Sequence, residues 1–590
     1  MELTRTFDLL DRYNQHFNKE TALAIKRGGK WHSWSTAEYI ENCYDFAFGL
    51  LESGMKKGDK IITVSNNRPE WNFADHGMSM CGIVHVPVYT SLSSAEYEYI
   101  VAHSEAIMVL VSDKKLYEKL LPACRKAGIE HKLYVFDDNA DLPSWKTILE
   151  AGQKNRDKWR EKLEEIKASI HEKDFTSLLY TSGTTGTPKA VMLSHQNLVQ
   201  NFIAAAGIFN LKPDDKYLSI LPLCHVSGRM GNYQTQYCGA GVYYPENMGA
   251  FVSALKEIGA NGFDAVPRIM EKIYDNVVAK GKQLTGMKYK IFFWAVRLGF
   301  KYDPKGKNGW WYRKRLAFAD KTIFSKWRDA LGGNVRLVGC GGASLQSSLE
   351  RLFWAAGVKV INMYGLTETS PIITISNPEK GKFKLGSVGS LIEGVEMKIA
   401  ADGEILCRGH DVMLGYYKDE KLNKEVFDDE GWFHTGDIGH IEDGKFLYVT
   451  DRKKEIFKLS NGKFVAPQLI EGYFKQSELI DQLMVIGEGQ KFASALIVPD
   501  FEILSKWADA QNVSFSTNEE LICMPEVQMH FQKEINHINR NLSEHERLLR
   551  FRLVKDTWSP ESGELSPTLK LKRKNVEQKY GELMKTIYLQ

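Results

Sequence analysis

The sequence lacks closely spaced pairs of cysteines. Its eight cysteines are scattered along the chain, and none of them forms a C-x-x-C pair. Neither a zinc site nor a disulfide framework is therefore predicted, and a reducing cytoplasm is the expected compartment. The N-terminal stretch MELTRTFDLLDRYNQ places acids among its apolar residues, which is not typical of a secretory signal.

Long apolar runs and a strong excess of charge are missing as well. No stretch reaches the length that spans a bilayer, and the formal net charge of +3 is too small to predict a nucleic-acid partner. The charge is unevenly spread, because residues 282–328 hold 13 Lys or Arg, two acids and 12 aromatic residues. This segment suits peripheral contact with the inner face of an anionic membrane. A core-packed helical hairpin with a solvated basic face is the alternative, and the sequence leaves both open.

Low-complexity tracts and repeats are also absent, and what is present is typical of a globular protein. The chain has 590 residues, which exceeds the usual size of one core, so at least two domains are expected. Residues 1–450 alternate β-rich and amphipathic stretches, which predicts an α/β domain with parallel strands and crossover helices. Closely spaced turns predict a β-rich subdomain over about 386–450. Residues 451–590 are expected to form a small α+β domain. No oligomeric state is predicted.

The most informative segment is FTSLLYTSGTTGTPKAVMLSH, residues 175–195. Its glycines allow backbone N–H groups to close around phosphate oxygens, its hydroxyls add donors, and Lys189 adds a positive charge. The donors of this predicted polyphosphate loop are Thr181, Ser182, Gly183, Thr184, Thr185 and Gly186. The spacing is not that of a Walker loop, which needs Lys directly after the last Gly and a hydroxyl after the Lys. A solvated Gly/Thr turn is the alternative.

The string YTSGTTGTPKAVMLSH resembles the signature of the adenylate-forming (AMP-binding) superfamily, with Ala190 where that family usually has Gly. This superfamily holds acyl-CoA synthetases, firefly luciferase and the adenylation domains of peptide synthetases. Further strings follow in the family's order over nearly the whole chain. VSNNRPEW and the long insertion over residues 281–333 resemble the long-chain fatty acyl-CoA synthetases. The resemblance implies a large α/β domain and a small C-terminal domain that moves about a hinge at 451–454.

The resemblance implies an ATP-dependent ligase that converts a long-chain fatty acid and CoA to acyl-CoA, AMP and pyrophosphate through an acyl-adenylate. ATP, Mg²⁺ and CoA are the expected cofactor, metal and co-substrate. No enzyme nucleophile is required, which agrees with the lack of a G-x-S-x-G motif. The alternatives are a medium-chain or aryl acid:CoA ligase, a fatty acyl-AMP ligase and, more distantly, a non-catalytic nucleotide-binding scaffold.

Three residues take catalytic roles by resemblance: Lys189, His225 and Lys570. His225 lies in LPLCHVSGRM, which resembles the segment lining the acyl and nucleotide pocket. Lys570 lies in K-L-K-R, which resembles the family's K-[IL]-x-R, and would bridge the attacking carboxylate and the α-phosphate, where negative charge accumulates. The preceding residues depart from the family's pattern, so Lys572 stays open. For the basic run that holds Lys570, the alternative is a solvated surface patch. For His225, the alternative is an ordinary half-buried histidine.

The other implied site residues bind the nucleotide, the metal or CoA. Those matched to nucleotide or CoA binding are Gly341, Gly342, Ala343, Asn362, Tyr364, Gly365, Thr367, Asp437, Arg452, Ser460 and Gly462. Glycines after an apolar strand would let adenine approach the backbone, and Tyr364 would stack on it. Asp437 would accept hydrogen bonds from the ribose, with a turn aspartate as the alternative. Thr184 and Glu368 would hold Mg²⁺, which needs only one or two carboxylates beside phosphate oxygens.

Overall fold

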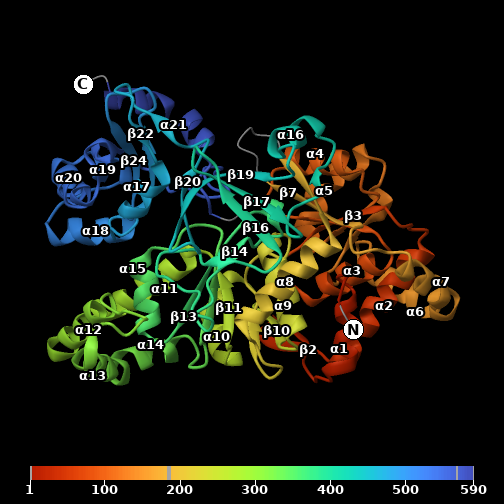
Figure 1. Ribbon diagram of the computed structural model, residues 1–590. Helices are drawn as coiled ribbons and strands as arrows, with labels where there is room; N and C mark the ends of the chain where they lie inside the picture. Colours follow the sequence, from red (N-terminus) through yellow and green to blue (C-terminus); the bar gives the residue numbers. More distant parts are fainter. Residues whose placement is uncertain (1–2, 182–187, 567–568, 589–590) are drawn as a thin grey trace. The chain divides into compact units, whose positions relative to one another are not determined.

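The structure is a computed structural model that describes residues 3–181, 188–566 and 569–588. The chain divides into two compact units (Figure 1). Unit 1 contains residues 1–397 and 407–433, and unit 2 contains residues 398–406 and 434–590. Unit 1 is α/β and unit 2 is α+β, which confirms the predicted fold class. The predicted hinge at 451–454 lies within unit 2, and its motion stays a prediction. None of the helices formed by the described residues combines the length and apolar character that a membrane crossing needs.

The first sheet of unit 1 is parallel except at the edge formed by β8 and β18. Because side chains alternate across a strand, Ile61 faces one hydrophobic cluster and Ile62 the other. In spatial order its strands are β18 (Gly415–Tyr416), β8 (Lys189–Ser194), β7 (Phe175–Thr181), β4 (Val84–Val88), β3 (Lys60–Val64), β5 (Met108–Val111) and β6 (Leu133–Val135).

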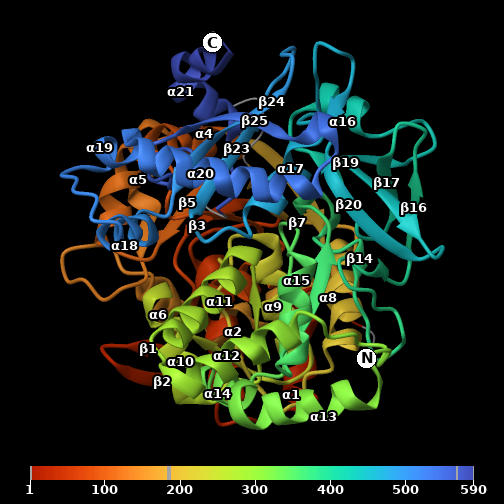
Figure 2. The ribbon, with the colours of Figure 1, turned by 90° about the vertical axis from the view of Figure 1, so that its left-hand side faces the viewer.

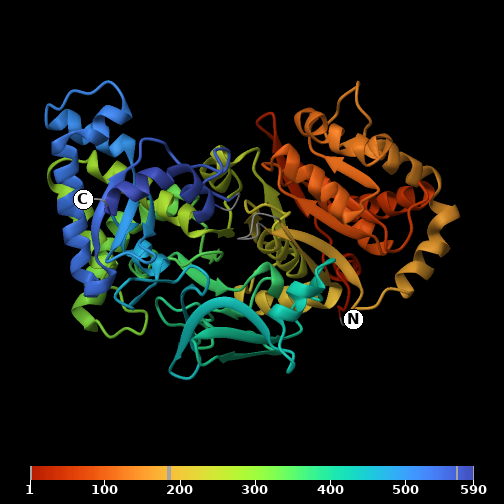
Figure 3. The same cartoon turned by 90° about the horizontal axis from the view of Figure 1, so that it is seen from above.

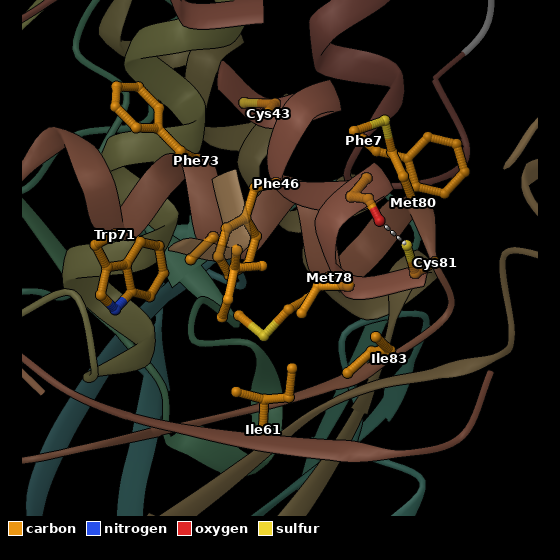
Figure 4. Packing of buried hydrophobic residues seen from close by; sticks show 14 of the residues in the cluster. Phe7, Cys43, Phe46, Ile61, Trp71, Phe73, Met78, Met80, Cys81 and Ile83 are labelled. Atoms are coloured by element: carbon orange, nitrogen blue, oxygen red, sulfur yellow. Dashed lines mark hydrogen bonds between the residues drawn. The ribbon is translucent and has the colours of Figure 1, made fainter. Parts of the chain in front are cut away.

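Helices cover both faces of this sheet, as the red and orange ribbons in Figure 3 show. One face carries α2 (Thr36–Glu52) and α3 (Pro69–Met80), and the other carries α4 (Ser94–Ser104) and α5 (Lys114–Lys126). Figure 4 shows Phe46, Trp71 and Met78 gathered over Ile61. Burial of each such large apolar side chain contributes roughly 1.5–3 kcal/mol. The sheet therefore has an apolar core on both sides, as a parallel sheet requires.

The second sheet of unit 1 is parallel in its centre, with antiparallel strands at both edges. In spatial order its strands are β15 (Ser390–Leu391), β14 (Thr374–Ile375), β13 (Lys359–Tyr364), β12 (Leu337–Cys340), β11 (Gly262–Ala265), β9 (Lys216–Leu218), β10 (Gly241–Tyr244), β1 (Leu23–Arg27) and β2 (Lys30–Trp34). The carboxyl ends of parallel strands meet at one edge, which is where ligands bind in open α/β sheets.

Helices also cover both faces of the second sheet. One face packs against α8 (His195–Phe209) and α9 (Val226–Tyr237). The other packs against α10 (Phe251–Ile258), α11 (Pro267–Lys282) and α15 (Ser347–Ala355). Residues 282–328, rich in Lys, Arg and aromatic side chains, are called the basic aromatic segment below. Outside this segment, the remaining α-helices of unit 1 are α1 (Asp8–His16), α6 (Lys146–Lys154), α7 (Arg156–Ala168) and α16 (Glu420–Val426).

The basic aromatic segment is helical and lies after α11. It forms α12 (Gly286–Gly299), α13 (Gly309–Ala319), a π-helical turn (Asp320–Phe324) and α14 (Ser325–Ala330). These helices lie together in Figures 1 and 2, and their inner side chains share a cluster with α15.

The predicted β-rich stretch contains β16 (Val395–Ile399), β17 (Glu404–Gly409), β19 (Phe433–Glu442) and β20 (Phe446–Arg452). The β19–β20 hairpin turns at Asp443 and Gly444, which have φ of +51° and +67°, as an Asp-Gly pair favours. Unit 2 then builds a sheet in the order β23-β24-β25 with helices packed on it. The remaining elements are β21 (Phe457–Lys458), β22 (Phe464–Val465), α17 (Pro467–Phe474), β23 (Ile480–Ile486), β24 (Ala493–Pro499), α18 (Phe501–Ala510), α19 (Asn518–Cys523), α20 (Pro525–Ile538), β25 (Leu548–Leu553) and α21 (Arg573–Tyr588).

Candidate active site

Two paired strands frame the predicted phosphate loop. Strand β7 ends at Thr181 and β8 begins at Lys189, and these two residues are paired across the ladder. The loop residues Ser182, Gly183, Thr184, Thr185 and Gly186 lie outside the described residues. Ala190 is a buried residue of β8, and its carbonyl accepts a hydrogen bond from the Tyr417 amide at 2.8 Å. A regular strand position carries no conformational penalty for alanine, so the departure from glycine there is unstrained.

Tyr416 connects the predicted lysine and the predicted metal ligand. It lies on β18, which pairs with β8, and its ring centroid is 5.0 Å from Lys189 Nζ. Its hydroxyl donates a hydrogen bond to Glu368 Oε1 at 2.7 Å. The Glu368 carbonyl also accepts from the Met413 amide at 2.9 Å, just before β18. One buried tyrosine therefore positions an ammonium and a carboxylate from distant parts of the chain. Tyr416 was not among the predicted residues, and nothing in its local sequence singles it out.

The glycine-rich residues follow neighbouring parallel strands. Cys340 at the end of β12 pairs with Asn362 on β13, so Gly341, Gly342 and Ala343 emerge beside Tyr364. Gly342 has φ of +84°, which favours glycine.

The turn after β13 requires glycine for a steric reason. A Cβ on Gly365 would lie 1.8 Å from the Pro371 carbonyl oxygen. The short 3-10 turn Thr367–Thr369 follows and carries Glu368. The sheet edge thus presents exposed backbone next to this carboxylate, an arrangement that admits a flat ring and phosphates.

Asn362 is held by a second acid. Its side-chain amide donates to Glu350 Oε1 at 2.7 Å, and the Gly386 amide donates to Glu350 Oε2 at 2.8 Å. Glu350 lies on α15, and burial raises the pKa of its carboxyl to about 8. Asn362 is itself buried, so its hydrogen bond to Glu350 ties the end of β13 to helix α15 inside the protein.

His225 caps helix α9. Its Nδ1 accepts a hydrogen bond from the Ser227 amide at 3.1 Å, which places the proton of the neutral ring on Nε2. Its ring centroid is 6.4 Å from that of Tyr89. The helix is anchored by the fully buried Arg229, which lies 2.6 Å from Asp75 and donates to Ser177 at 2.5 Å. A buried ion pair of this kind holds the helix start, and with it His225, in place.

The predicted residues of unit 2 fall into separate places within that unit. Asp437 is buried, and its Oδ1 is 3.2 Å from Arg452 Nε across the β19–β20 ladder. Ser460 and Gly462 lie in the exposed turn between β21 and β22. The structure therefore brings Asp437 and Arg452 together and places the pair Ser460 and Gly462 in one turn.

Lys570 is an exposed residue that follows Leu569, and its amide donates to Ser566 Oγ at 3.0 Å. Lys572 is partly buried, and its amide donates to the Glu564 carbonyl. The next residue, Arg573, lies 2.9 Å from Glu455 and 2.6 Å from Glu471. The basic run is therefore not a uniform solvated patch, because its arginine is committed to internal ion pairs.

The donor set for a metal is limited. Across the residues that the structure describes, no group of three or more His, Cys, Asp or Glu side chains could enclose a metal ion. Glu368 offers one carboxylate, held by the same tyrosine that contacts Lys189, which fits Mg²⁺ because this ion keeps few protein ligands and takes phosphate oxygens.

Comparisons with known proteins identify the family of this chain. The family described as AMP-binding enzyme matches residues 10–417, and the AMP-binding enzyme C-terminal domain matches residues 454–590. A long-chain-fatty-acid–CoA ligase of Mycobacterium bovis is 30% identical over 577 residues, covering 95% of this chain and 93% of that protein. A long-chain-fatty-acid–CoA ligase of Homo sapiens is 30% identical over 611 residues, with 97% and 90% covered.

Solved structures show the same fold. The adenylation domain of a carboxylate reductase from Mycobacterium chelonae superimposes with a TM-score of 0.78 at 20% identity, covering 99% of this chain and 91% of that one. At that identity the likeness concerns the fold alone. The match over residues 10–417 and the relatives at 30% identity concern the sequence itself. On this ground the chain belongs to the AMP-binding enzyme family.

Proposed function

We propose that this protein is an ATP-dependent ligase that joins a long-chain fatty acid to CoA through an acyl-adenylate. The observation that carries the proposal is the meeting of Lys189 and Glu368 at Tyr416, beside the glycine-rich strand end. Relatives named long-chain-fatty-acid–CoA ligases match over more than nine-tenths of the chain, which supports this acid class.

In the first step a carboxylate oxygen of the acid attacks the α-phosphorus of ATP. A new P–O bond forms, and the bond to pyrophosphate breaks. Lys189 and the loop after β7 counter the charge of the phosphates, while Gly341 to Ala343 and Tyr364 receive the adenine. Glu368 and Thr184 would hold Mg²⁺, which supplies further charge neutralisation when bound. Lys570 would contact the attacking carboxylate and the α-phosphate.

In the second step the CoA thiol attacks the acyl carbonyl of the adenylate. A C–S bond forms, the C–O bond to AMP breaks, and the thiol proton is released. The turn that holds Ser460 and Gly462 would line the entry of the CoA arm. Asp437 would accept hydrogen bonds from the ribose hydroxyls, with Arg452 beside it. Between the two steps, rotation of the C-terminal domain about residues 451–454 would withdraw Lys570 and bring in the turn that receives CoA.

The compartment proposed for the protein is the reducing cytoplasm. All eight cysteines are free, and six of them are buried, as expected where thiols need no pairing.

The test is an ATP- and CoA-dependent thioester assay over acids from acetate to oleate, with aryl acids alongside. We expect kcat/KM to be highest for long acids, with one AMP and one pyrophosphate released per thioester. Lys189→Ala should lower the rate strongly, and the matched control Lys173→Ala, an exposed lysine before β7, should not. Preference for aryl or short acids would contradict the acid class. Adenylate without thioester would indicate an acyl-AMP ligase, and no pyrophosphate release would indicate a binding scaffold.

A further inference from the structure

Helices α12 and α13 carry charge of one sign only. They contain Lys288, Lys290, Arg297, Arg313, Lys314 and Arg315, and neither helix contains Asp or Glu. All six basic side chains are exposed. A surface of one sign is complementary to a partner of the opposite sign, so this pair of helices is suited to a partner that is uniformly negative.

The same two helices expose large apolar side chains. The exposed fraction is 73% for Trp311, 55% for Trp310, 52% for Phe318, 43% for Tyr289 and 69% for Met287. Single exposed apolar residues are ordinary, but a group on two adjoining helices forms a patch that marks an interaction site.

The inner side of the segment is already committed to packing. Phe292, Phe324 and Trp327 are buried in a cluster with Leu352 of α15. Gly299 lies so close to α15 that an added Cβ would be 2.4 Å from Leu352 Cδ1. The core-packed hairpin considered from the sequence therefore describes the inner side. The outer aromatic residues pack only against neighbours within the segment, as Phe318 does against Trp294, and they remain largely exposed.

A groove runs between the outer sides of α12 and α13, which are neighbours in Figures 1 and 2. Its volume is about 450 Å³. Its walls include Lys290, Trp294, Trp311, Lys314, Arg315 and Phe318. Lys314 Nζ lies 4.1 Å from the Trp310 ring centroid, and the Arg315 guanidinium lies 5.6 Å from that of Trp294. The cationic groups of Lys314 and Arg315 therefore lie next to the tryptophan rings of the groove region.

We propose that this groove is the docking surface for an anionic lipid bilayer. Indole rings favour the boundary between headgroups and acyl chains, and the apolar stems of Lys and Arg allow their charges to reach the phosphates. The protein adsorbs by this face, with Trp311 and Phe318 entering the headgroup layer. Nucleic acid also carries phosphates, but it would leave the exposed Met287 and the apolar floor without a role. The inference does not depend on which acid the enzyme activates.

The test uses the full-length protein and vesicle flotation. Phosphatidylcholine vesicles are compared with vesicles that hold about one third phosphatidylserine, at low and high salt. The wild type should float with the anionic vesicles, less so at high salt. The variant Lys290→Glu, Lys314→Glu, Arg315→Glu should bind roughly a hundredfold more weakly.

The matched control reverses three other exposed cations of unit 1, Lys115, Arg125 and Lys154, so the change in net charge is the same. It should float like the wild type. Equal loss in both variants would show only a net-charge effect and would overturn the proposed surface.

A second variant separates insertion from charge. Trp311→Ser with Phe318→Ser alters exposed side chains and leaves the charge unchanged, so the fold should persist, as near-ultraviolet circular dichroism would confirm. We expect about tenfold weaker flotation. Unchanged flotation would overturn the proposed insertion. Competition with single-stranded RNA is the last arm: RNA bound through this groove, without vesicle binding, would replace the lipid proposal.

Discussion

Tyr416 shows how one neutral side chain organises two charged ones. Its ring lies beside the Lys189 ammonium and its hydroxyl bonds to Glu368, so the tyrosine supports both groups that would face the nucleotide phosphates. A buried hydroxyl that donates to a carboxylate fixes the orientation of that carboxylate. The position of Glu368 therefore depends on a residue with no charge of its own.

Tyr416→Phe isolates this effect, because it removes the hydroxyl and keeps the ring. A hydrogen bond to a charged group contributes about 1.5–3 kcal/mol, so we expect kcat/KM for ATP to fall roughly tenfold or more, with a higher Mg²⁺ requirement. Pyrophosphate release at varied ATP and Mg²⁺ measures it. Tyr417→Phe is the control, since the Tyr417 hydroxyl donates to Glu105 instead; an equal effect there would contradict a specific role for Tyr416.

At the scale of elements, α15 supports the strand end through one buried carboxyl. Glu350 joins Asn362 on β13 to the Gly386 amide. Because burial raises the pKa of Glu350 to about 8 from 4.5, the folded state keeps a proton that the unfolded chain loses at lower pH. The stabilising contribution of this group is therefore complete below about pH 4.5 and is lost as the pH rises toward 8.

The raised pKa of Glu350 predicts that the protein loses stability as the pH rises. Between pH 5 and pH 8 the Glu350 contribution to the free energy of unfolding should fall by at most about 1.4 kcal/mol per pH unit. Glu350→Gln keeps the size of the side chain and removes the ionisation, although its amide nitrogen can no longer accept from one of the two N–H donors. Its denaturation midpoint should therefore vary less with pH than that of the wild type, whatever its absolute value. Glu393→Gln, at an exposed residue, should leave the wild-type slope unchanged. Parallel pH curves for the wild type and Glu350→Gln would refute the account.

The presence of individual buried strands was predictable from the sequence. The run KIITV is buried at its last four positions, and MVLV is apolar and buried throughout, as expected for strands covered on both faces; the two runs form β3 and β5. The division of their side chains between two clusters follows from the two-residue period alone. The order of strands within a sheet was not predictable in this way, because β9 lies between β10 and β11 through contacts that no local pattern specifies.

At the scale of the whole molecule, the prediction is that Lys570 of the C-terminal domain serves the first half-reaction and not the second. Lys570→Ala should lower adenylate formation by roughly a hundred- to a thousandfold, because it would remove the charge that we propose for the developing transition state. Thioester formation from supplied acyl-adenylate should persist. Pyrophosphate release and thioester yield are measured separately.

Lys572→Ala serves as the comparison, because it removes the same charge two residues later. Loss of adenylation in that variant alone would assign the role to Lys572. Equal loss of both half-reactions in Lys570→Ala would contradict the division.

The sequence by itself determined the family and predicted the chemical groups of the site. Glycines, hydroxyls and one lysine within a short stretch predict a phosphate loop, since each would act through its own backbone or side chain. Tertiary structure alone decided which side chains meet. Tyr416 reaches Lys189 and Glu368 only because β18 pairs with β8, and the aromatic residues of α12 and α13 divide into buried and exposed sets only because α15 covers one side. Long-range backbone pairing and burial depend on contacts between distant segments, which local residue patterns do not specify.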